Sequence, residues 1–150
     1  MGTSTNIEAT LNKLYNALSE GDVETWIAMH TPDAALNVNG STAVSGRTEG
    51  AQNVLENLLP ILFSRVQPGS KIGVNWKLMC ADDKRAVVIF EGEAKSLGGE
   101  QYNNRYCQIL EFNDDGLIQE LWEFFDTALA DNVIFKDNPS APASTATFRY

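Results

Sequence analysis

The sequence is poor in the residues from which proteins build metal and disulfide sites. Its 150 residues include two cysteines, Cys80 and Cys107, and a single histidine, His30. The cysteines do not form a C-x-x-C pair, and a structural zinc ion takes about four Cys or His ligands. We therefore expect no metal site, no cofactor and two free, buried thiols.

Positive charge is scarce as well. There are 11 Lys and Arg residues against 20 Asp and Glu residues, which gives a net charge of −9. Nucleic acids and anionic membranes bind basic surfaces, so neither is an expected partner. No run approaches the ~20 apolar residues of a membrane span, and residues 1–10 lack the basic start and apolar stretch of a signal peptide. The expected location is the cytoplasm.

Apolar residues in the first half of the chain recur at helical spacing. Leu11, Leu14 and Leu18 follow one another every three or four residues, which predicts an amphipathic helix. Helices are expected over 5–19, 23–30 and 48–66, with a short strand or hairpin over 34–46. Pro60 lacks a backbone donor, so we expect it to interrupt the third helix near residue 59.

The second half of the chain reads as strands joined by short turns. Four strands are expected over 71–79, 85–95, 101–112 and 117–126. Helices followed by an antiparallel meander predict an α+β fold with separate layers. We expect one domain over 1–136 and a tail over 137–150 that is rich in Pro, Ser, Ala and Thr, ordered by docking of Phe148 and Tyr150.

Three motifs resemble those of a known superfamily. They are Glu20–Trp26 leading to Pro32-Asp33-Ala34, Tyr102–Tyr106, and Phe112–Asp126. In order and spacing the series resembles the nuclear transport factor 2-like superfamily, which includes ketosteroid isomerases, limonene epoxide hydrolases and SnoaL-like polyketide cyclases. The resemblance covers residues 7–128. It implies a cystatin-like cone, with three N-terminal helices packed in a strongly curved, mostly antiparallel sheet around a ligand pocket, and a homodimer through the outer face of the sheet.

The catalytic positions of these families carry over only in part. The place of the isomerase base holds Val38, the isomerase donor position holds Gln108, and Tyr15 lies near the isomerase tyrosine. The missing base argues against ketosteroid isomerase activity. The last acid of the epoxide hydrolases matches Glu123, whereas their Arg-x-Asp pair falls near residues 91–93, which lack the arginine. In SnoaL-like cyclases one pocket acid works as acid and base, a role open to Glu123.

Polar side chains on the last two strands are candidates for the pocket. Asn104, Tyr106 and Gln108 share one face of their strand, and the resemblance turns this face and Glu123 inward. Apolar surroundings would raise the pKa of Glu123 and suit it to acid/base catalysis. The alternatives are a structural network that joins Glu123 to Tyr106 or Gln108, and a solvent-facing strand edge for the other three side chains.

His30 is expected at the end of the second helix, on the face that carries Trp26. A helix C-terminus would raise the pKa of this histidine and favour its charged form, for acid/base work or for pairing with Glu123. The alternative is a packed histidine that is bonded to a backbone carbonyl. The aromatic side chains expected either in a pocket wall or in the plain core are Tyr15, Trp26, Trp76 and Phe125.

Two functions are consistent with these residues. The first is a cofactor-independent enzyme that moves protons on a small, largely apolar molecule, as a cyclase, isomerase, dehydratase or hydrolase. Its catalytic residues would be Glu123 and His30, and its ligand-binding residues would be Tyr15, Trp26, Trp76, Asn104, Tyr106, Gln108 and Phe125. The second is a non-catalytic module that binds a small ligand or assembles as a dimer.

Overall fold

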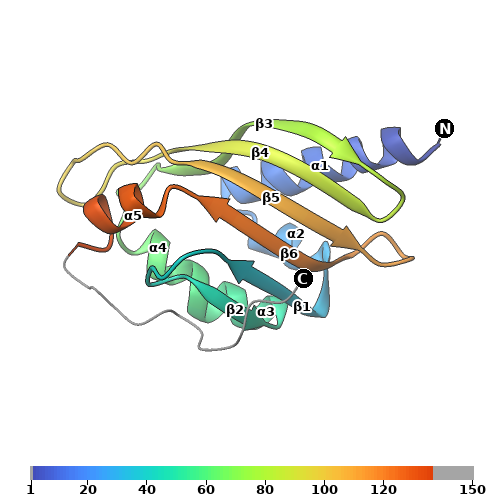
Figure 1. The fold of residues 1–150 in the computed structure, drawn as a ribbon, viewed down its shortest axis with the longest axis horizontal. Coiled ribbons are helices and arrows are strands. Elements are labelled where there is room, and N and C mark those ends of the chain that lie inside the picture. The colour runs from blue at the N-terminus through green and yellow to red at the C-terminus, as the bar shows by residue number, and fades with distance from the viewer. Residues whose placement is uncertain (1, 137–150) are drawn as a thin grey trace.

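The computed structural model describes residues 2–136, in which helices cover one face of a curved sheet (Figure 1). The helical elements are α1 (Gly2–Glu20), α2 (Val23–Ala28), α3 (Ala51–Asn53), the π-helical turn η1 (Val54–Leu58), α4 (Leu59–Phe63) and α5 (Thr127–Val133). The strands are β1 (His30–Val38), β2 (Gly46–Glu49), β3 (Lys71–Ala81), β4 (Arg85–Glu93), β5 (Arg105–Phe112) and β6 (Ile118–Phe125). The predicted tail, with Phe148 and Tyr150, lies outside the described residues.

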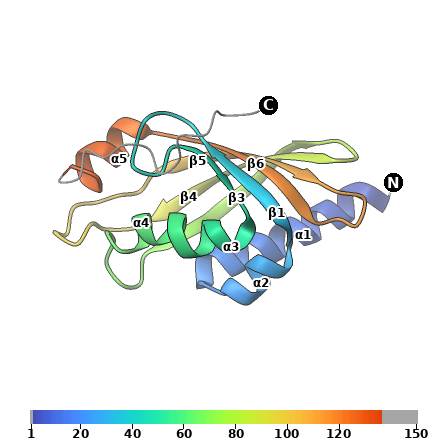
Figure 2. The same ribbon diagram turned by 90° about the horizontal axis from the view of Figure 1, so that it is seen from below.

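The six strands form one sheet in the order β2-β1-β6-β5-β4-β3. Neighbouring strands are antiparallel except for β1 and β6, which run parallel. Figure 2 shows α1, α2, α3 and α4 on the same side of the sheet. The predicted α+β architecture with helices in the hollow of a mostly antiparallel sheet is confirmed. The parallel pair was not predicted, because it joins strands that lie about 80 residues apart in the sequence.

The second helix ends two residues earlier than predicted, at Ala28, and His30 is the first residue of β1. The chain joins the sheet directly after the helix: the backbone N–H of Ile118, at the start of β6, donates to the carbonyl of the C-cap residue Met29 at 2.9 Å. Pro32, expected to lie between elements, falls in an irregular stretch of β1, where a missing backbone donor costs little. The prediction of a helical His30 was therefore wrong.

The third helix is interrupted at the predicted place. It begins at Ala51 rather than at Thr48, because Thr48 pairs with β1 as part of β2. The backbone N–H of Leu59 donates to the Val54 carbonyl, five residues back, which defines the π-helical turn. Pro60 follows directly and has no backbone donor to continue the regular pattern.

The core fills the space between the helices and the inner face of the sheet. Its largest fully buried apolar side chains come from α1, from η1 and from every long strand except β3: Leu11, Leu14, Tyr15, Val38, Val54, Val88, Phe90, Leu110 and Ile118. A second apolar cluster lies under α5 and includes Tyr102 and Phe135. Among residues 2–136, no helix is both long and apolar enough to cross a membrane.

Both cysteines have free thiols, but the expectation that they are buried was wrong. Cys80 is exposed and Cys107 is half-buried. Cys80 lies near the end of β3, which is an edge strand of the sheet and has a neighbour on one side only.

Gly73 fits a tight contact between β3 and α1, so its replacement by alanine is expected to destabilise the fold. Its φ is +96°, and a Cβ atom would lie 3.1 Å from Cδ2 of Leu18. We expect Gly73→Ala to lower the free energy of unfolding by about 1–3 kcal/mol, measured by urea denaturation. Gly98→Ala is the matched control, because its Cβ would have 3.7 Å to the Ser96 hydroxyl. An equal effect of both changes would contradict this account.

Candidate functional site

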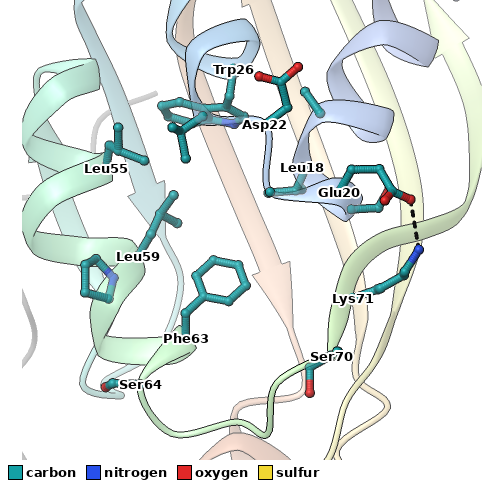
Figure 3. Close-up of a pocket in the computed structure, with 16 residues that line it drawn as sticks. Leu18, Glu20, Asp22, Trp26, Leu55, Leu59, Phe63, Ser64, Ser70 and Lys71 are labelled. Atoms are coloured by element: carbon teal, nitrogen blue, oxygen red, sulfur yellow. Dashed lines mark hydrogen bonds and ion pairs between the residues drawn. The ribbon is translucent and has the colours of Figure 1, made fainter.

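Two cavities meet between the helices and the sheet. The inner cavity has a volume of about 70 Å³ and reaches the inner faces of β1, β5 and β6. The outer pocket has a volume of about 640 Å³ and lies between the end of α1, α2, α4 and the start of β3 (Figure 3). Four side chains line both spaces and are called the apolar boundary: Leu18, Trp26, Leu59 and Phe63. The boundary between the inner cavity and the outer pocket therefore consists of aliphatic and aromatic side chains.

The structure brings six of the nine predicted site residues together around the inner cavity. These six are Tyr15, Trp26, His30, Tyr106, Gln108 and Glu123. They come from α1, α2, β1, β5 and β6, so they are close only in the folded chain. The remaining three, Trp76, Asn104 and Phe125, do not line this cavity.

A fixed chain of hydrogen bonds holds the carboxyl group of Glu123. Gln108 and Glu123 are directly opposite each other on β5 and β6. The Gln108 amide Nε2–H donates to Oε1 of Glu123 at 2.9 Å, and the Tyr15 hydroxyl donates to Oε1 of Gln108 at 3.0 Å. The tyrosine thus selects the orientation of the amide in which its N–H group faces the carboxyl. Val38 pairs with Glu123 across β1 and β6.

The apolar surroundings shift the ionisation of the carboxyl group toward neutral pH. Burial raises the pKa of Glu123 to about 7, and the hydrogen bond from Gln108 acts in the opposite direction. Near pH 7 both the protonated and the ionised forms are therefore populated, which is the condition for acid/base work. Burial, with a smaller contribution from Glu123, raises the pKa of Tyr15 well above its ordinary value, so the tyrosine stays a neutral donor.

His30 is held by its neighbour Trp26 in a way that fixes its tautomer. The Nδ1 atom lies 2.6 Å from the Trp26 carbonyl oxygen, and the two rings have centroids 3.9 Å apart. Because a carbonyl oxygen only accepts, Nδ1 carries the proton. Burial lowers the pKa of His30 to about 4. The predicted rise was wrong, because the ring is buried at the start of a strand and burial disfavours its charged form.

Asn104 ties two strands together at a distance from the cavity. Its Nδ2–H group donates to the Tyr102 hydroxyl at 3.1 Å and to the Asp126 carbonyl at 3.0 Å. Its Oδ1 atom accepts from the backbone N–H groups of Arg105 and Asp126. All its polar atoms are engaged, so the structure gives it a structural position and not one in the cavity. These bonds also explain why β5 begins at Arg105 and not at residue 101.

The other two displaced aromatics support residues that do line the cavity. Trp76 stacks on Tyr15 with ring centroids 5.7 Å apart, and Phe125 lies 5.7 Å from Tyr106. Both belong to the core shell, which was the alternative interpretation of their spacing.

Glu91 and Glu93 do not contribute a catalytic pair to the inner cavity. Glu91 accepts a hydrogen bond from Asn75 and lies 3.6 Å from the Arg105 guanidinium, while Glu93 is exposed. Their surroundings are those of a solvated strand face.

Of the residues that line the outer pocket, sequence reasoning predicted Trp26 as a site residue and missed the others. Leu59 and Phe63 were expected in the buried face of a helix, and Phe63 is in fact 37% exposed at the pocket. Figure 3 shows these two side chains facing Leu18 and Trp26 across the opening. The lip of the pocket carries an ion pair between Lys71 Nζ and Glu20 at 2.8 Å. The predicted interruption before Pro60 was the one sequence signal for this pocket, because side chains after the interruption point in a different direction from those before it.

Comparisons with known proteins agree on one fold. The SnoaL-like domain family matches residues 11–121. No curated protein matches. Among solved structures, an NTF2-like protein of unknown function from Burkholderia pseudomallei has a TM-score of 0.73 and 16% identity, over 85% of this chain and 95% of that chain.

Two further structures are similar to the same extent. TerC, co-crystallised with polyporic acid, has a TM-score of 0.73 and 21% identity, over 87% of this chain and 98% of that one. A putative polyketide cyclase from Xanthomonas campestris pv. campestris has a TM-score of 0.71 and 14% identity, over 89% and 99%. At these identities the structures establish the fold alone. A further similar structure, from Xanthomonas campestris, is described as a protein with a cystatin-like fold. The family match spans most of the chain, and the protein therefore belongs to the SnoaL-like domain family.

Proposed function

We propose that this protein is a cofactor-independent enzyme that transfers protons on a small, largely apolar molecule, with Glu123 as the acid and base. The observation that carries the proposal is a carboxyl group with a pKa of about 7 in an apolar cavity. A group poised near neutral pH both accepts and returns a proton without a large energetic cost. Cyclisation, isomerisation, dehydration and hydrolysis all use such a step.

The neighbours of Glu123 have distinct roles in this proposal. The ionised carboxylate takes a proton from the substrate, and the N–H group of Gln108 stabilises that carboxylate at 2.9 Å. Tyr15 does not touch the carboxyl group, so it is a positioning residue that keeps the amide of Gln108 in the donating orientation. The protonated acid then returns the proton to another atom of the same substrate, which leaves the enzyme unchanged.

The outer pocket supplies the binding surface for the body of the substrate. Its volume of about 640 Å³ falls in the usual range for small-molecule sites. Its walls include Trp26, Leu55, Leu59 and Phe63, which favours an apolar ligand. Polyporic acid in TerC and the description of the Xanthomonas protein as a putative polyketide cyclase support an organic ligand of this kind.

A non-catalytic binding module is the second candidate function. The observation that favours it is that neither Glu123 nor His30 lines the outer pocket. A ligand held there alone would not reach the carboxyl group, and its affinity would not change as Glu123 titrates.

Proton transfer by Glu123 is testable without knowledge of the substrate. We expect the protein to accelerate exchange of the α-hydrogens of 2-tetralone, an apolar enolisable ketone, in D2O followed by NMR. Glu123→Gln should slow the catalysed exchange by about 100-fold or more. Glu8→Gln is the control, because Glu8 is exposed on α1. Exchange at the wild-type rate in Glu123→Gln would contradict the proposal, whereas binding of the ketone without exchange would support the second candidate.

Glu123 and His30 should give the free energy of unfolding opposite pH dependences. The pKa of Glu123 is raised from 4.5 to about 7, so the folded chain keeps a proton that the unfolded chain loses, and stability falls as pH rises through this window. The pKa of His30 is lowered from 6.5 to about 4, so stability falls as pH drops through that window. Each shift corresponds to at most about 3 kcal/mol.

The two dependences nearly cancel between pH 4.5 and 6.5 in the wild type. We expect Glu123→Gln to become more stable as pH rises across this range, and His30→Asn to become less stable. Urea denaturation at several pH values measures both slopes, with Glu8→Gln expected to follow the wild type. Slopes of the same sign in the two variants would show that the cavity does not shift these groups as described.

We further propose that two copies associate through the outer face of the sheet. This face carries the exposed side chains of Ile89 on β4 and Phe124 on β6, with half-buried Cys107 between them on β5. Apolar patches of this kind mark interaction sites.

Ile89→Arg should convert a dimer into a monomer. Light scattering after gel filtration is expected to give twice the chain mass of 16.5 kDa for the wild type and the single-chain mass for the variant. Leu97→Arg is the control, because Leu97 is 64% exposed in the turn after β4, away from this face. A monomeric wild type would rule out the dimer.

A further inference from the structure

One polar atom in the inner cavity has no partner. The Nε2 atom of His30 is buried and accepts no hydrogen bond from residues 2–136. The side chain is only 5% exposed and lines the inner cavity. Because Nδ1–H donates to the Trp26 carbonyl, Nε2 presents a lone pair and acts as an acceptor. A buried acceptor without a partner is costly, so this atom points to a donor that the described residues do not supply.

Among residues 2–136, no other polar group of the cavity donates to Nε2 of His30. One of the two N–H groups of the Gln108 amide donates to Glu123, and the Tyr15 hydroxyl donates to Gln108. The ionised carboxyl group of Glu123 is itself an acceptor. Neither lysine nor arginine lines the inner cavity. An anionic group, such as a carboxylate or a phosphate, would meet no lysine or arginine there, and the ionised form of Glu123 would repel it.

From this arrangement we propose that the ligand enters the inner cavity with a neutral O–H group, which donates a hydrogen bond to Nε2 of His30. The inference rests on the proposed function of the same cavity and names its substrate class: a hydroxyl-, enol- or phenol-bearing molecule. In this role His30 binds and orients the substrate, and Glu123 remains the group that moves the proton.

The size of the two spaces fits such a molecule. A volume of about 70 Å³ holds a polar group and an adjoining carbon or two, because a water molecule in liquid takes about 30 Å³. The carbon skeleton then crosses the apolar boundary into the outer pocket of about 640 Å³. The O–H group is thereby presented to His30 at the closed end.

The single histidine makes this contact directly observable. We would record the imidazole nitrogens of His30 by 15N NMR at pH 6, first in the free protein. Two probes of similar shape are then added: 2-naphthol, which has the O–H group, and 2-methoxynaphthalene, which lacks it. The Nε2 resonance should move toward its hydrogen-bonded position with 2-naphthol only. Affinity for 2-naphthol should be about five- to tenfold higher, the effect of one neutral hydrogen bond.

His30→Asn provides the matched variant. The asparagine amide can still donate to the Trp26 carbonyl from the position of Nδ1, but nothing replaces Nε2. The preference for 2-naphthol should disappear while both probes still bind. An Nε2 resonance that already shows a hydrogen bond in the free protein and does not move would assign the site to an internal water and overturn the inference. Equal affinity for the two probes, or binding of neither, would also overturn it.

The outcome is separable from that of the proposed function. The NMR measurement uses the wild-type protein and is independent of how well His30→Asn folds. If Glu123→Gln abolishes exchange of 2-tetralone but the Nε2 resonance ignores 2-naphthol, proton transfer stands and the hydroxyl preference falls. If exchange is unaffected by Glu123→Gln but 2-naphthol binds His30 selectively, the reverse holds.

Discussion

The amide group of Gln108 is the contact on which the arrangement of the site depends. It joins a helix to two strands, because it accepts from Tyr15 on α1 and donates to Glu123 on β6. An amide has one accepting and one donating end, so fixing one end fixes the other. The orientation of Glu123 is therefore set by the packing of α1 in the hollow of the sheet. A shift of the helix would reach the carboxyl group through this single side chain.

The inner cavity disfavours the charged form of both its acidic and its basic side chain. Burial moves the pKa of an acid, Glu123, upward and that of a base, His30, downward. Both groups are consequently close to neutral at pH 6, although one is usually anionic and the other partly cationic at that pH. The opposite shifts have one cause, the low polarity of the surrounding side chains. The cavity thus favours neutral ligands before any specific contact is made.

Much of the fold and part of the site could be predicted from the sequence. The inward direction of Glu123 followed from the family resemblance, and the interruption near Pro60 followed from its missing donor. The role of Asn104 was not predictable, because two of its four bonds join the start of β5 to Asp126 after β6, and such tertiary contacts have no sequence period. The state of His30 was mistaken because the end of a short helix was placed two residues too late. That small error placed at the end of a helix a residue that is buried at the start of a strand.

The π-helical turn before α4 has a consequence for how homologous sequences are compared. A turn of this kind holds one residue more than a regular helical turn, which rotates everything after it by about 100° about the helix axis. Leu59 and Phe63 lie just beyond it and form half of the apolar boundary. A relative with a regular helix here would need one residue fewer to present the same two side chains. If the two sequences were aligned without a gap, identical residues at 59 and 63 would then point in different directions. A single-residue gap in this turn would therefore indicate a difference in the shape of the pocket.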